Sequence, residues 1–94
     1  MSLEKVRSDI SDTDSAIIRL IARRQELADE IVKIKIQNGL SVHDENRKVQ
    51  VLDAVFRQAV ESRIDPVAVQ EIFSILIAMS EERQHAFSGE GNLP

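Results

Sequence analysis

Residues 2–37 contain neither proline nor glycine, and apolar residues recur along them at helical spacing. These residues are Leu3, Val6, Ile10, Ile17, Leu20, Ile21, Ala28 and Ile31. At about 100° per residue they share one broad stripe, which predicts a single amphipathic helix. At about 1.5 Å per residue the helix would be roughly 54 Å long, which exceeds the diameter of a small domain. Part of its apolar stripe therefore needs a partner from elsewhere.

Two shorter helices are predicted after the first. Ser2 is the expected N-cap of the first helix, and Asn38-Gly39 suits a left-handed C-terminal cap that ends it. Asp44 predicts the N-cap of a second helix that runs to about residue 62. Asp65-Pro66 predicts the start of a third helix that runs to about residue 87. Their expected buried residues are Val49, Leu52, Val55, Phe56 and Ala59, then Val69, Ile72, Phe73, Leu76 and Ile77.

The fold class follows from the lengths of these helices. No strand signal, internal repeat or low-complexity segment is visible. Because two short helices cannot cover the long one, the stripe is expected to pair with a second copy of the chain. The prediction is an all-α homodimer, with one helical domain at residues 1–87 and a flexible C-terminal tail at residues 88–94.

The composition excludes several functions. Apolar residues at 43% and charged residues at 30% are ordinary for a soluble globular protein. The chain has no cysteine, which excludes disulfides and thiolate chemistry. No apolar run reaches the length of a membrane span and the N-terminus is not a signal peptide, so a cytoplasmic location is the default. A net charge of −4 without a basic tract argues against nucleic acid as a partner.

Two cations occupy the face of the long helix that should be apolar. Arg24 and Lys35 are eleven residues apart, so they differ by only about 20° around the helix. With Ala28 and Ile31 between them they form one row. Buried cations are costly unless a negative group meets them, so the row favours an anion as its partner.

Polar residues of the other helices fit the same interpretation. Lys48 lies at the edge of the second apolar face, while Ser80 and Gln84 lie beside Leu76 in the third. Arg47 is in the first turn of the second helix. Arg7 lies about 100° from Arg24, from where it could reach the site of a dimer mate.

Ordinary explanations exist for each of these residues taken singly. Arg and Lys at the edge of a stripe usually bury their stems and keep the charge in water, and Ser and Gln near a helix end are usually solvated. His43 and His85 are interpreted as surface residues. The polar groups taken together favour an anion-binding pocket within the helical bundle. The residues alone specify no reaction, and a non-catalytic helical dimerisation module remains an alternative.

The complete spacing resembles a known family. Its parts are Arg7, Arg24 and Lys35 in the first helix, Asp44 and Arg47 in the second, and Ser80 and Gln84 in the third. The strings IRLIARRQELADEIVKIK and IFSILIAMSEERQ resemble the same family. The chain is similar over about residues 3–86 to the all-helical chorismate mutases.

This resemblance implies an intertwined homodimer that rearranges chorismate to prephenate, a step of phenylalanine and tyrosine biosynthesis, without a cofactor or metal. It implies that Arg24, together with Arg7 from the partner chain, holds the two substrate carboxylates, with help from Ser80. It implies that Lys35 and Gln84 donate hydrogen bonds to the ether oxygen as catalytic residues. Arg47 would lie beside the substrate and Asp44 near its ring hydroxyl.

Lys48 departs from the family pattern. Many members carry a glutamate directly after the arginine that is Arg47 here, and that glutamate contacts the ring hydroxyl. Lys48 could instead pair with Asp44 one turn earlier and leave the pocket. Isochorismate pyruvate lyases share the fold and the pocket but lack the glutamate, so this activity is the alternative function.

Overall fold

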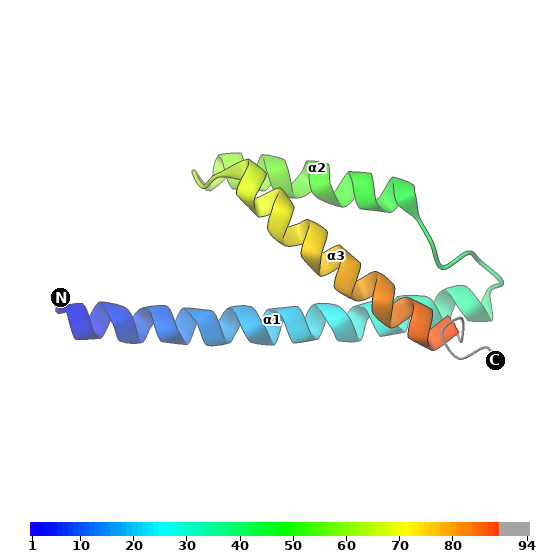
Figure 1. Ribbon diagram of the computed structural model, residues 1–94, viewed down its shortest axis with the longest axis horizontal. Coiled ribbons are helices and arrows are strands. Elements are labelled where there is room, and N and C mark those ends of the chain that lie inside the picture. The colour runs from blue at the N-terminus through cyan, green and yellow to red at the C-terminus, as the bar shows by residue number, and fades with distance from the viewer. Residues whose placement is uncertain (89–94) are drawn as a thin grey trace.

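The computed structural model describes the backbone of residues 1–88 and the side chains of residues 1–86. This part of the chain consists of α1 (Leu3–Gln37), α2 (Glu45–Glu61) and α3 (Pro66–Ser88), and it contains no strand (Figure 1). The molecule measures 56 × 25 × 22 Å, and α1 runs along its longest axis. The predicted all-α fold with one long and two shorter helices is confirmed, and the homodimer stays a prediction.

Local side chains define where each helix begins. Ser2, Asp44 and Asp65 directly precede the three helices. The side chain of each accepts a hydrogen bond of 3.0 Å from a backbone N–H of the following turn. These bonds satisfy donors that a helix leaves unpaired at its N-terminus. All three predicted helix starts are confirmed.

The ends of α1 and α2 share one backbone arrangement. Gly39 has a φ of 67°, and the amide of Leu40 donates to the carbonyl of Lys35 at 2.8 Å. This left-handed cap lets the chain turn away from α1. Arg63, with a φ of 59°, occupies the equivalent position after α2. A residue with a Cβ is strained in this region of φ and ψ. The end of α2 therefore carries a conformational free-energy cost that the glycine at the end of α1 does not.

The third helix extends one residue further than predicted. The sequence places its end at about residue 87, and α3 ends at Ser88. Ser88 is therefore helical, whereas the rest of the predicted tail, residues 89–94, lies outside the described residues. None of the described helices is long and apolar enough to cross a membrane. The cytoplasmic location stays a prediction.

Helix α3 connects the other two helices. It leaves the turn after α2, diverges from α2 and crosses the C-terminal half of α1 (Figure 1). It packs against both helices, while α1 and α2 do not pack against each other. The small core combines residues of all three helices, namely Ala28, Val32, Val55, Ala59 and Ile77. Val32 of α1 has no solvent exposure at all.

Much of the apolar stripe of α1 remains uncovered in the single chain. The N-terminal half of α1 projects beyond the part that α3 crosses (Figure 1). Leu3, Ile10 and Ile17 on this projecting half are 64%, 55% and 50% exposed. A series of exposed apolar side chains along one helix is typical of an interaction surface.

Three residues that were predicted to be buried are exposed in the single chain. They are Val49 and Phe56 of α2 and Ile72 of α3. Helix α2 packs only against α3, so a narrower strip of its apolar face is covered than the sequence periodicity indicates. Ile72 lies about 200° around α3 from Gln70, whose side chain contacts α2, so it is left uncovered in the single chain.

Candidate active site

A pocket of about 250 Å³ forms where the three helices meet. Its walls come from the C-terminal half of α1, the first turns of α2 with the preceding loop, and the C-terminal half of α3. The apolar part of its lining consists of Leu27, Ala28, Ile31, Val42, Val51 and Ile77. This size suits a small molecule rather than a macromolecule.

Seven of the eight predicted site residues line this pocket. They are Arg24, Lys35, Asp44, Arg47, Lys48, Ser80 and Gln84. Ala28 and Ile31 lie between the two cations of α1 and also line it, so the whole row faces one cavity. The structure thus brings these residues together, while the role of each one stays a prediction.

Arg24 is held in place by α3. Its Nη1 donates to the hydroxyl of Ser80 at 2.7 Å and to the carbonyl of Leu76 at 3.2 Å. The Ser80 hydroxyl in turn donates to the same carbonyl at 3.1 Å, and Ser80 is only 8% exposed. Two acceptors on one turn of α3 therefore fix the orientation of the guanidinium group.

The charge on Arg24 lacks compensation within the described residues. It forms no ion pair with a described carboxylate. Burial, and secondly the positive charge of Arg47, lower its pKa from the ordinary value. Both causes disfavour the charged form of Arg24. An anion that enters the pocket would therefore be attracted to a positive charge that no described carboxylate compensates.

Lys35 and Asp44 tie the pocket to the loop between α1 and α2. The Nζ of Lys35 donates to the carbonyl of Val42 at 3.3 Å. The Oδ1 of Asp44 accepts from the amide of Arg47 at 3.0 Å, so one of its oxygens is used in the helix cap.

Lys48 stays in the pocket and does not pair with Asp44. It lines the cavity and forms no ion pair with any described carboxylate. The possible side-chain ion pair between Lys48 and Asp44 that the sequence left open is therefore not formed. Lys48 adds to the positive charge of the pocket.

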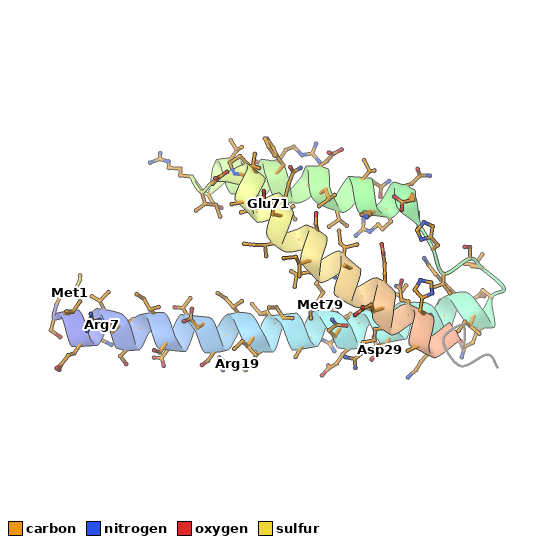
Figure 2. All side chains as sticks on the ribbon, in the orientation of Figure 1. Met1, Arg7, Arg19, Asp29, Glu71 and Met79 are labelled. Carbon is orange, nitrogen blue, oxygen red and sulfur yellow. The ribbon has the colours of Figure 1, made fainter. Side chains whose placement is uncertain are left out.

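Arg7 is the predicted site residue that this pocket does not include. Figure 2 shows it near the free N-terminal end of α1, far from the crossing with α3. It is seventeen residues before Arg24, which corresponds to about 25 Å along a helix. A single chain therefore cannot bring Arg7 to its own pocket.

Sequence reasoning missed two polar residues of the lining, Glu81 and His43. Glu81 lies about 100° from Ser80 around α3, at the edge of the face that Ser80 shares with Gln84, and helical periodicity alone does not decide whether such an edge residue meets solvent or the pocket. His43 was predicted to be a surface residue. Its side chain is largely exposed and its Nε2 lies 3.2 Å from a carboxylate oxygen of Glu45, yet it also contributes to the pocket wall. No group of three or more potential ligand side chains among the described residues could hold a metal ion.

The pocket carries an excess of positive charge. Its side chains include four cations, at Arg24, Lys35, Arg47 and Lys48, and the carboxylates of Asp44 and Glu81. Fixed donors in a partly buried site stabilise negative charge that is present in a ligand or that develops during a reaction. The fold and pocket define an all-helical protein with a cationic cavity whose charge suits a small polyanion.

Comparison with known proteins identifies the family. The chain belongs to the chorismate mutase type II family, whose sequence profile matches residues 6–85. It is 31% identical over 88 residues to a chorismate mutase of Methanocaldococcus jannaschii, which covers 94% of this chain and 89% of that protein. It is 27% identical over 86 residues to the T-protein of Haemophilus influenzae, which covers 92% of this chain but only 23% of the T-protein. The family resemblance in the sequence is confirmed.

Proposed function

We propose that the protein is a chorismate mutase, an isomerase that rearranges chorismate to prephenate. The observation that carries the proposal is one pocket that combines an arginine fixed by α3 with the donors Lys35 and Gln84. Membership of the family and the name of the Methanocaldococcus relative support the same reaction.

The chemistry of the reaction matches the residue types of the pocket. The rearrangement breaks a C–O bond and forms a C–C bond within one molecule, and it requires neither a nucleophile nor proton transfer. Arg24 binds a substrate carboxylate and, with Arg47 beside the substrate, holds the flexible dianion in its reactive conformer, which supplies proximity and orientation. Lys35 and Gln84 donate to the ether oxygen as negative charge develops on it.

The pocket is completed by a second copy of the chain in this proposal. Arg7 lies too far along α1 to serve its own pocket, and exposed apolar residues continue along the projecting half of the helix. Pairing two copies of α1 would bury that stripe and would bring the partner's arginine to the second carboxylate. The protein then works as an intertwined homodimer with two equivalent sites.

The proposal is tested by incubating the purified protein with chorismate and, separately, with isochorismate. Loss of chorismate is followed by ultraviolet absorbance and the product is identified by mass. We expect prephenate, and we expect Lys35→Ala to lower kcat by about 10²–10³-fold, because a donor to the developing charge is lost. Lys33→Ala, on another face of α1, is the matched control and should keep its activity. Release of pyruvate from isochorismate at a much higher rate, or no conversion of chorismate, would overturn the proposal.

A further inference from the structure

The carboxylate of Glu81 lies in the pocket and has no role in the mechanism described above. Glu81 is half-buried and lines the cavity. It makes no ion pair with the described cations, although four of them line the same cavity. A carboxylate in a site for a dianion is unfavourable unless it has a partner of its own.

The position of Glu81 on α3 separates it from the arginine clamp. Ser80 faces α1, because it accepts the hydrogen bond from Arg24. Gln70 is eleven residues before Glu81, so the two lie within about 20° around α3. Gln70 donates to the carbonyl of Leu52 at 3.2 Å, so this side of α3 faces α2. Glu81 therefore lies on the side of α3 that faces α2, about 100° around the helix from Ser80.

Lys48 is one of the two cations, with Arg47, that α2 contributes to the pocket. It lies one turn before Leu52 on α2 and lines the pocket. Its positive charge offsets part of the electrostatic cost of a second carboxylate near a bound dianion. A substrate whose carboxylates are held by arginines on one side presents its remaining groups to this α2 side.

The remaining polar group of the proposed substrate is a ring hydroxyl, which needs an acceptor when it leaves water. The hydroxyl oxygen of Ser80 already accepts from Arg24, and Oδ1 of Asp44 accepts from the backbone of α2. The Glu81 carboxylate accepts no hydrogen bond from the described residues, so both of its oxygens are open to a ligand, whereas Asp44 retains only Oδ2. Ionised acceptors form shorter and stronger hydrogen bonds than neutral ones.

We propose that Glu81 accepts the hydrogen bond from the ring hydroxyl of the bound dicarboxylate and thereby determines specificity for a hydroxylated substrate. This inference rests on the proposed function. Glu81 orients the ring from the α2 side while Arg24 holds a carboxylate from the α1 side. Lys48 adds positive charge on the α2 side of the pocket and does not contact the hydroxyl itself.

The test compares chorismate with an analogue that lacks only the ring hydroxyl. In Glu81→Ala, kcat/KM for chorismate should fall by about 10- to 100-fold, the usual effect of losing a hydrogen bond to a charged group. For the analogue, kcat/KM of the Glu81→Ala variant should stay close to kcat/KM of the wild type. Glu82→Ala is the matched control, because Glu82 is the exposed neighbouring carboxylate outside the pocket lining, and it should leave both substrates unaffected. Circular dichroism checks that each variant is folded.

Two results would overturn the role of Glu81 while leaving the mutase activity intact. One is an equal loss for both substrates in Glu81→Ala, which would indicate a general electrostatic effect. The other is that Asp44→Asn, and not Glu81→Ala, removes the preference for the hydroxylated substrate. By contrast, failure of the wild-type protein to convert chorismate would overturn the proposed function itself.

Discussion

The Nη1 of Arg24 lies 2.7 Å from the hydroxyl oxygen of Ser80, in a hydrogen bond that joins α1 to α3 at the pocket. The same hydroxyl donates to the carbonyl of Leu76, so the arginine, the serine and one turn of α3 form a closed set of contacts. The guanidinium group is thus oriented before any ligand arrives, which lowers the entropic cost of binding.

Ser80→Ala tests this preorganisation. The substitution removes one acceptor of Arg24 and leaves the carbonyl of Leu76 as the other. Losing a hydrogen bond of this kind costs about 1 kcal/mol, so KM should rise about fivefold, with a smaller change in kcat. Steady-state kinetics with chorismate measure both constants. Ser74→Ala, at an exposed position of the same helix, is the control. A fall in kcat at constant KM would contradict the interpretation.

Mixing two inactive variants tests whether Arg7 acts in the partner's pocket. Arg7→Ala and Lys35→Ala should each lose most activity as homodimers. When they are unfolded and refolded together, a hybrid dimer regains one pocket with an intact Lys35 and an intact partner arginine. Random pairing should restore about a quarter of the wild-type activity. If Arg7 served its own chain, both pockets of the hybrid would be defective and mixing would restore nothing.

Gln25 of α1 is a buried residue whose amide oxygen has no hydrogen-bond partner among the described residues. It is 9% exposed, and its Oε1 accepts no hydrogen bond from the described residues. An unsatisfied buried polar group costs about 1–3 kcal/mol, so Gln25→Met should raise the free energy of unfolding by about 1 kcal/mol or more. Urea denaturation measures the change, with the exposed Gln58→Met as control. A destabilised variant would mean that Gln25 has a partner in the assembled protein.

The two left-handed caps should respond to substitution in opposite directions. Arg63→Gly relieves the strain of a φ of 59° and should stabilise the protein by about 0.5–1 kcal/mol, after allowing for the greater flexibility of unfolded glycine. Gly39→Ala introduces the same strain at a φ of 67°, where no atom lies within 4 Å of the new Cβ, and should destabilise it. Thermal unfolding compares the two. Equal shifts of the same sign would show that backbone strain is not the cause.

Local rules were enough to predict the helix starts and the row of polar residues on α1. The caps at Ser2, Asp44 and Asp65 depend on neighbouring residues only, and helical periodicity alone places Arg24 and Lys35 on one side. Glu81 was missed for a different reason. Whether a charged residue on α3 meets solvent or a pocket depends on how far α2 and α3 diverge, and periodicity carries no information about that angle. The exposure of the residues expected to be buried on α2 has the same origin.

The absence of packing between α1 and α2 has a consequence for the bound state. In the described part of the chain, α3 and the loop at residues 38–44 hold these two helices in place. A dianion bound by Arg24 of α1 and Arg47 of α2 would therefore link two helices that do not otherwise pack against each other. Substrate would then be a structural component of the folded protein as well as its reactant, and saturation with ligand should raise the melting temperature.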